Sequence, residues 1–171
     1  WTVQKASSID IVSISAARDF VSRGQNDILV IVNIKNSGQG DLKEISGVLL
    51  FKTATNQVVS TDYQVEAAVD NPTTLKGGLT TALNFNVEVG AEATNEIISL
   101  FSTISGKDLN SNKIVTGSST AIKDSWTVQS VPSVNIKTIQ TTPGSVNRGQ
   151  QNISVTMSVE NSGEADYTIS D

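Results

Sequence analysis

One stretch of the sequence has residue types and a spacing that suit metal binding. In DLNSNK, Asp108, Asn110 and Asn112 stand at alternate positions, which is the arrangement of oxygen ligands in calcium loops. The glycine at the sixth position and the closing glutamate of such loops are both missing. A hairpin tip made of turn-forming residues explains the stretch as well. Ca²⁺ is therefore a weak candidate, and we otherwise expect neither a metal nor a cofactor.

The composition removes most catalytic chemistry. The chain has no histidine and no cysteine, so no Ser–His or Cys–His nucleophile can be built. Carboxylate pairs such as Glu88 with Glu92, or Asp62 with Glu66, are explained better as solvated surface charge. The turns SRGQ and LKGG do not match a phosphate-binding loop. We therefore expect a protein that is not an enzyme.

Charge and hydropathy restrict the partners. The net charge is −5 and the chain has only 12 Lys and Arg residues, without a basic run, so a nucleic-acid surface is not expected. No apolar run reaches the length of a membrane span. An acidic chain that lacks cysteine and is rich in Ser, Thr and Asn suits the prokaryotic cell exterior and also some cytosolic proteins. An extracellular or cell-surface location is the prediction.

The elements that hold these residues are predicted to be strands. The segment NISVTMSVEN puts Ile153, Val155, Met157 and Val159 on one face, and this period of two indicates a half-buried strand. Similar segments are separated by turn residues, and none has a helical period. We expect an all-β, immunoglobulin-like antiparallel sandwich. The further strand candidates are 9–15, 28–34, 45–53, 57–65, 83–89, 96–104 and 113–119.

The chain contains an internal repeat with a period of 125 residues. Residues 1–46 align with 126–171 without a gap, and 17 positions are identical, whereas unrelated pairs would match at about one position in sixteen. A period of this length suits a whole domain. We expect 1–4 to end a linker from a preceding repeat, 5–125 to be a complete repeat, 126–129 to be a linker, and 130–171 to supply the first strands of a second repeat.

The tetrapeptide WTVQ begins each of the two copies of the repeat, at 1–4 and at 126–129. It contains the only tryptophans of the chain, Trp1 and Trp126, and it follows a polar run where two domains are predicted to meet. A large aromatic residue with a polar N–H suits such a junction. The alternative is that each tryptophan fills the end of its own sandwich. The sequence favours neither.

The best-matched part of the repeat resembles a known family. Val30–Gly38 and Val155–Gly163 share a strand followed by Asn-Ser-Gly, which resembles the Ig-like repeats of prokaryotic surface proteins, namely CARDB-type adhesion-related domains and surface-layer repeats. The resemblance implies a spacer, a fibre or lattice subunit, or an adhesion module, without catalytic residues. In this motif we expect Asn36 or Gly38, and likewise Asn161 or Gly163, to adopt a positive φ at a turn.

Two outward positions suggest a packing interface. Repeat two has Ser154 and Thr156 where repeat one has Leu29 and Ile31, so the first copy of this strand is apolar on both faces. Such strands are usually covered on both sides. Two alternatives stay open: one or two exposed aliphatic residues are normal, and loops of the same chain are another cover. The interpretation is that Leu29 and Ile31 pack against another domain or subunit.

These observations favour a structural function. We expect a repeat of a surface protein, filament or S-layer-like lattice, whose partners are copies of itself or neighbouring repeats. One alternative is an adhesin-type module that binds a host or matrix glycan or protein. The other is an accessory spacer of a secreted hydrolase.

Overall fold

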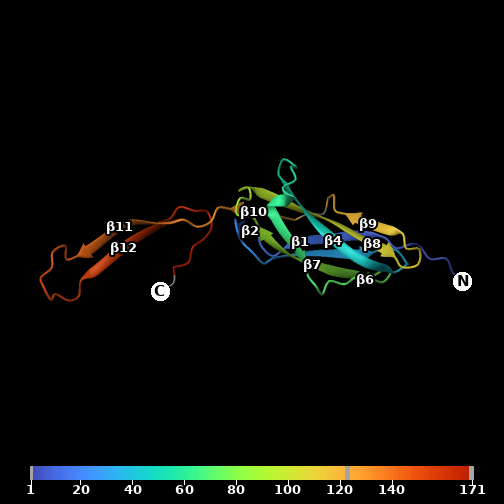
Figure 1. Ribbon diagram of the computed structural model, residues 1–171, viewed down its shortest axis with the longest axis horizontal. Coiled ribbons are helices and arrows are strands. Elements are labelled where there is room, and N and C mark those ends of the chain that lie inside the picture. Colours follow the sequence, from blue (N-terminus) through green and yellow to red (C-terminus); the bar gives the residue numbers. More distant parts are fainter. Residues whose placement is uncertain (1, 122–123, 170–171) are drawn as a thin grey trace. The chain divides into compact units, whose positions relative to one another are not determined.

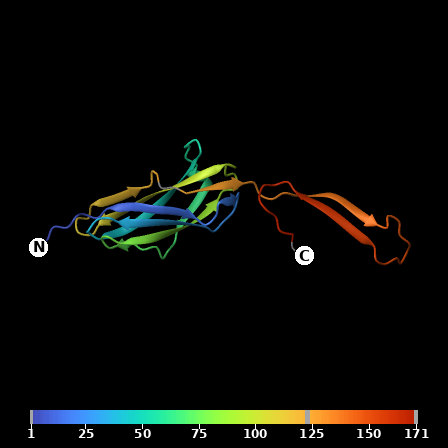
Figure 2. The same cartoon turned by 180° about the vertical axis from the view of Figure 1, so that it is seen from behind.

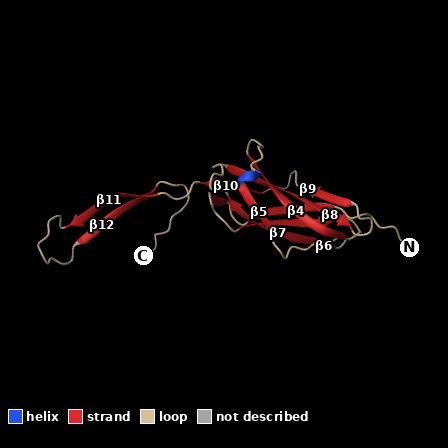
Figure 3. Cartoon of the chain, viewed as in Figure 1, coloured by secondary structure: helices blue, strands red, loops and turns tan. Residues whose placement is uncertain are grey.

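The computed structural model describes residues 2–121 and 124–169, and within them the fold is all-β (Figures 1 and 3). The chain divides into two compact units, residues 1–128 and 129–171. The first unit is an antiparallel β-sandwich, as the sequence predicted. Among the described residues its one helical element is a single 3₁₀ turn, η1 (Ser60–Asp62).

The first layer of the sandwich is a four-stranded antiparallel sheet. Alternate side chains of its strands point inward, most clearly in the segment LNFNVEV of the third strand, where apolar and polar residues alternate. A bulge interrupts the register of the edge pair between Ile11 and Ser13. The strand order is β1 (Ile9–Ala16), β3 (Ile28–Asn36), β7 (Thr80–Val89), β5 (Tyr63–Ala67).

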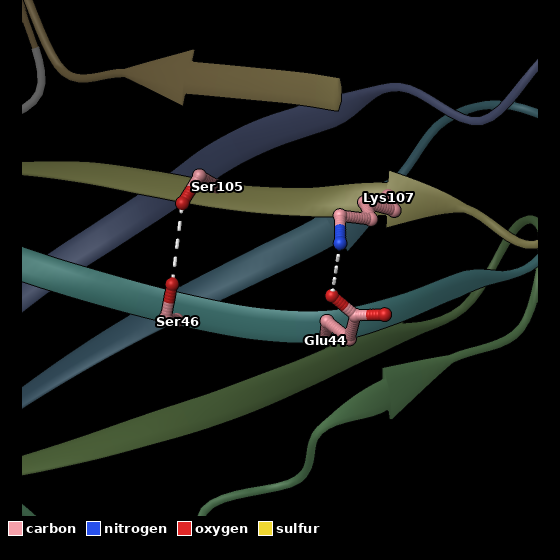
Figure 4. Close-up of polar contacts among 4 residues, drawn as sticks. All are labelled: Glu44, Ser46, Ser105 and Lys107. Carbon is pink, nitrogen blue, oxygen red and sulfur yellow. Dashed lines mark hydrogen bonds and ion pairs between the residues drawn. The ribbon is translucent and has the colours of Figure 1, made fainter. Parts of the chain in front are cut away.

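The second layer is a larger sheet centred on the long pair β4 (Leu42–Thr53) and β8 (Ile97–Asp108). Figure 2 shows the two layers from behind. Glu44 has a φ of 53° where the register of β4 shifts. Figure 4 shows how polar side chains join the strands there: the Glu44–Lys107 ion pair, and the Ser46 and Ser105 hydroxyls 3.2 Å apart. The path is β2 (Phe20–Ser22), β10 (Asp124–Gln129), β8, β4, β6 (Thr74–Leu75), and β9 (Ile114–Ser118) also pairs with β8.

The core lies between the two layers and is mainly aliphatic. The alternate residues predicted to face inward on β3 and β7 are all buried, which is the arrangement that the period of two requires. Three aromatic rings lie together in this core, with centroids 4.1 to 5.8 Å apart: Phe51 stacks on both Tyr63 and Trp126, and the rings of Tyr63 and Trp126 are tilted by 43°.

The second unit is a two-stranded antiparallel hairpin. Its strands are β11 (Val134–Thr142) and β12 (Ser154–Asn161). Both are exposed along their whole length.

Two strand assignments differ from the expectation. The range 57–65 holds η1 and only the start of β5, because the chain makes an isolated bridge from Val58 to Lys52 before it turns. The expected linker 126–129 is the end of β10, which pairs with β8. Strands β2 and β6, with three and two residues, are too short to show a period.

Candidate functional site

One polar arrangement that joins several segments is centred on Asn36, at the end of β3. Its side chain is fully buried. The Oδ1 atom accepts hydrogen bonds from the amides of Ser8 (3.1 Å) and Gly38 (3.1 Å). The Nδ2 atom donates to the carbonyls of Gly40 (2.8 Å) and Leu75 (3.2 Å). The side-chain amide of Asn36 thus makes four hydrogen bonds, two as acceptor and two as donor. These bonds connect segments that are far apart in the sequence.

Gly38 is required in this arrangement by close approach and not by a left-handed backbone. A Cβ atom at this position would lie 2.1 Å from the carbonyl oxygen of Ala6 and 2.5 Å from Cα of Ser7. Neither Asn36 nor Gly38 has a positive φ, and the same holds for Asn161 and Gly163. The expectation of a positive φ in this motif was therefore wrong. The side chain of Asn36 binds the loop amides itself, and the glycine admits the neighbouring chain.

The second unit repeats this arrangement. The Oδ1 atom of Asn161 accepts hydrogen bonds from the amides of Ser133 (3.0 Å) and Gly163 (3.0 Å), and its Nδ2 atom donates to the carbonyl of Ala165 (2.8 Å). A Cβ atom on Gly163 would lie 2.2 Å from the carbonyl oxygen of Val131. Each of these partners stands 125 residues after its counterpart around Asn36.

The two hairpins also share their strand register. Ile9 faces Asn36 at one end of the β1–β3 pair, and Val134 faces Asn161 at the same end of the β11–β12 pair. The bulge recurs as well, between Ile136 and Thr138 in the second hairpin. Every pair in the first hairpin, from Ile9–Asn36 to Ala16–Val30, has a counterpart displaced by 125 residues on both strands.

The apolar faces of the two hairpins differ in exposure. In the first hairpin the face lies in the core, where Val30 and Val32 are 0% exposed. Their counterparts Val155 and Met157 are 63% and 56% exposed. Large apolar side chains on a surface mark an interaction site when they form a continuous group. The exposed members of this face are Val134, Ile136, Ile139, Ile153, Val155, Met157 and Val159.

Leu29 and Ile31 lie on the outer face of the four-stranded sheet. Leu29 is 37% exposed and Ile31 is half-buried. Their cross-strand neighbours on β7 are Asn86 and Asn84, so the two residues form an apolar island among polar side chains. Whether another molecule covers this island stays a prediction.

A second apolar island lies on the outer face of the larger sheet. Val48 is 63% exposed. Leu50 faces Phe101 across the β4–β8 pair, and the ammonium group of Lys52 lies 5.1 Å from the centroid of the Phe101 ring. The apolar run VLLF therefore has half of its side chains in the core and half on this outer face.

Asp108, the first residue of the calcium candidate, is used by the protein itself. Its Oδ2 atom accepts a hydrogen bond from the amide of Ser7 (2.9 Å). Its Oδ1 atom accepts hydrogen bonds from the amides of Asn110 and Ser111 and from the Ser111 hydroxyl (2.9 Å). The hydrogen bonds from Ser7 and Ser111 hold the pKa of Asp108 well below its usual range.

The geometry around Asp108 is that of a turn at a hairpin tip. Asn112 has a φ of 56°, which is a conformation that asparagine tolerates in turns. A calcium ion would have to replace the hydrogen bonds that Asp108 accepts. Within residues 2–121 and 124–169, no three His, Cys, Asp or Glu residues lie close enough to hold a metal ion.

Trp126 occupies the interior of the sandwich. It is 1% exposed and stacks on Phe51 with ring centroids 5.6 Å apart. The interpretation that the tryptophan fills a sandwich fits this copy, and the sandwich is that of the first unit, which precedes the second repeat. Trp1 lies outside the described residues.

Two polar atoms of this aromatic group have no hydrogen-bond acceptor in the described part of the chain. They are the hydroxyl of Tyr63 and Nε1 of Trp126, and both are buried. Burial raises the pKa of Tyr63 to about 12, because a phenolate would be poorly solvated there.

No helix in the described part of the chain is long and apolar enough to cross a membrane.

Comparison with known proteins shows no family for this chain. No family model matches this chain, and no curated protein matches it. Among similar solved structures is AvmM, which catalyses macrocyclization in alchivemycin A biosynthesis, at 10% identity and a TM-score of 0.49, over 72% of this chain and 89% of that one. Another is the C-terminal domain of wzt, at 11% identity and a TM-score of 0.49, over 74% of this chain and 77% of that one.

A third similar structure is the archaellum periplasmic stator complex of FlaF and FlaG from Sulfolobus acidocaldarius. It has 14% identity and a TM-score of 0.31, over 70% of this chain and 97% of that one. Each of these three structures is at most 14% identical to this chain and has a TM-score of at most 0.49. The function must therefore be inferred from the chain's own residues.

Proposed function

We propose that this chain is a non-enzymatic structural repeat of an extracellular surface protein, fibre or lattice. It works through packing between domains and between subunits. The observation that carries the proposal is the recurrence of one hairpin, with its register, bulge and asparagine hydrogen bonds, at a spacing of 125 residues. Repeated domains of one type offer each neighbour the same surface, and contacts between unlike faces of such domains propagate into open arrays.

Two outer faces of the sandwich suit contact between subunits. The face of the four-stranded sheet has Leu29 and Ile31 at its centre. The face of the larger sheet has Val48, Leu50 and Phe101. Burial of one such aliphatic side chain contributes about 1.5–3 kcal/mol. We propose that the first face of one copy packs on the second face of the next.

The charges around the two islands are complementary. On the outer face of the four-stranded sheet, alternation places Asp10, Glu66 and Glu88 against one lysine, Lys35. On the outer face of the larger sheet it places three lysines against one acidic residue, Glu44. Opposite charge guides association and fixes the orientation of the partners. The three lysines are Lys43, Lys52 and Lys107.

The test is assembly of the purified chain, followed by analytical ultracentrifugation and electron microscopy. Leu29→Ser combined with Ile31→Thr introduces the residues that the second repeat carries at these positions. We expect this variant to lose self-association, while Asn86→Ser, a polar change beside Leu29, leaves it intact. A wild-type chain that stays monomeric at every concentration, or a double variant that assembles unchanged, would refute the proposal.

A further inference from the structure

The apolar face of the β11–β12 hairpin is not covered by any described residue of its own unit. Five large side chains on it, those of Ile136, Ile139, Val155, Met157 and Val159, are between 37% and 63% exposed. A two-stranded hairpin with such a face is at best marginally stable in water. The outer edge of β12 is also open, because within the described residues its only strand partner is β11. A further strand beside β12 would cover the exposed apolar face and pair with the open edge.

The first unit shows what covers the equivalent hairpin. There β3 lies between β1 and β7, and β7 runs antiparallel to β3, with Val87 opposite Ile28 and Phe85 opposite Val30. Strand β7 carries large apolar residues at every second position, and all of them are buried. It therefore satisfies the backbone of β3 and adds apolar side chains to the same face. These residues are Leu83, Phe85, Val87 and Val89.

The segment that leads into β7 also binds Asn36. The backbone N–H of Asn36 donates to the carbonyl of Leu79 (2.9 Å), and the backbone N–H of Gly78 donates to the backbone carbonyl of Asn36 (2.8 Å). The Nδ2 atom of Asn36 adds the hydrogen bond to Leu75. Asn161 carries the same groups at the end of β12, with its side chain held by the same local hydrogen bonds.

We propose that β12 is an acceptor for a polypeptide strand with the chemistry of β7. The strand has large apolar residues at alternate positions, follows a Gly-Gly turn, and adds antiparallel to the open edge of β12. Displacement of the first unit's register by 125 residues places the strand's equivalent of Val87 opposite Ile153, and that of Leu83 opposite Met157. Main-chain hydrogen bonds supply affinity, and alternate side chains supply selectivity, as in other cases of strand addition.

Packing of two hairpins through their apolar faces is a weaker solution. It would cover the side chains but leave the N–H and C=O groups of the β12 edge without a strand partner, and an open edge tends to recruit another strand. A strand of β7 chemistry satisfies both the face and the edge. Met157 stands where the first unit has Val32, and its flexible side chain can adapt to an incoming residue.

The probe is a fluorescently labelled synthetic peptide of residues 75–89, titrated into the full chain. We expect its anisotropy to rise to saturation, and amide hydrogen exchange to slow across 153–159. Met157→Lys should weaken binding about tenfold or more. Thr156→Lys, a matched change on the polar face of β12, should leave binding unchanged. Both side chains are exposed, so neither change removes a core contact.

A peptide of the same composition with its apolar and polar positions exchanged is the second control, and it should not bind. Absence of binding, equal binding of the exchanged peptide, or protection that falls outside 153–159 would overturn the inference. A chain that dimerises through the hairpin and excludes the peptide would overturn it as well. The inference deepens the proposed packing function, yet the two can fail separately: the peptide experiment reports on Met157, and the assembly experiment reports on Leu29 and Ile31.

Discussion

Replacement of Asn36 by alanine tests whether its buried side chain holds the sandwich together. The change removes the acceptor of two amide donors, those of Ser8 and Gly38, and the donor to two carbonyls, those of Gly40 and Leu75. A buried polar group left without a partner costs about 1–3 kcal/mol. Because partial relaxation and water recover some of this, we expect a loss of about 3–5 kcal/mol in the free energy of unfolding. That is a large share of the roughly 5–15 kcal/mol of a typical domain.

The assay is urea unfolding followed by the fluorescence of buried Trp126, in a Trp1→Phe background so that one tryptophan reports. With a slope of about 1–3 kcal/mol per molar urea, the midpoint should fall by about 2 M. The matched control is Asn161→Ala, which removes the same side chain from the other unit. We expect it to change the unfolding of the first unit by less than about 0.5 kcal/mol.

A third variant separates the two halves of the amide. Asn36→Asp keeps the acceptor for the amides of Ser8 and Gly38 but turns a carboxylate toward two carbonyl oxygens, so we expect it to be at least as destabilising as alanine. A loss below about 1 kcal/mol for Asn36→Ala, or a tolerated Asn36→Asp, would refute the reasoning. The residue would then be an ordinary turn former.

Three further predictions concern the first unit. Gly38→Ala should destabilise by more than about 2 kcal/mol because its Cβ would meet backbone, whereas Gly24→Ala, at a φ of 72° in open space, should cost only about 1 kcal/mol; equal urea midpoints would contradict this. Tyr63→Phe should leave stability at pH 7 unchanged or raised, since the buried hydroxyl has no acceptor in the described chain. The unfolded phenol ionises first, near pH 10, so wild-type stability should fall between about pH 10 and 12, and Tyr63→Phe, unlike the exposed-site control Tyr167→Phe, should lessen that fall. Asp108→Asn should lower the melting temperature at pH 7 and flatten the loss of stability in acid, because a depressed carboxyl pKa stabilises the fold above the unfolded value and that contribution disappears as pH falls below it; an unchanged acid limb would contradict the assigned hydrogen bonds.

The two-layer β architecture could be predicted from the sequence, because burial of one face of a strand imposes a period of two on its apolar residues. Segment 83–89 shows that period clearly, and its apolar residues are buried. In 28–34 the inward residues Ile28, Val30, Val32 and Ile34 are buried as well, but Leu29 and Ile31 add apolar residues on the outer face. The linker expected at 126–129 came from the repeat and was wrong, because these residues pair in β10. A repeated tryptophan at the boundary of a repeat suggested a junction, but position in a repeat does not reveal which strand a residue pairs with.

The candidate site was located by the sequence but its mechanism was not. Asn36 and Gly38 stand out because Asn161 and Gly163 repeat them, and local turn chemistry predicted a positive φ. The actual constraint on Gly38 is steric: a side chain there would collide with the backbone at Ala6. Ala6 lies next to Gly38 only in the folded chain. The exposure of the second hairpin is equally hidden, since its alternation matches that of the buried first hairpin.

The central claim is that 134–161 is built as 9–36 is built. Its most direct test is solution NMR of the full chain, with hydrogen-bond couplings and cross-strand Cα–H contacts measured in both hairpins. The account predicts Ile136 opposite Val159 and Ile139 opposite Met157, with the extra residue between Ile136 and Thr138, as in the first hairpin. A shifted register, or the absence of that extra residue, would contradict it.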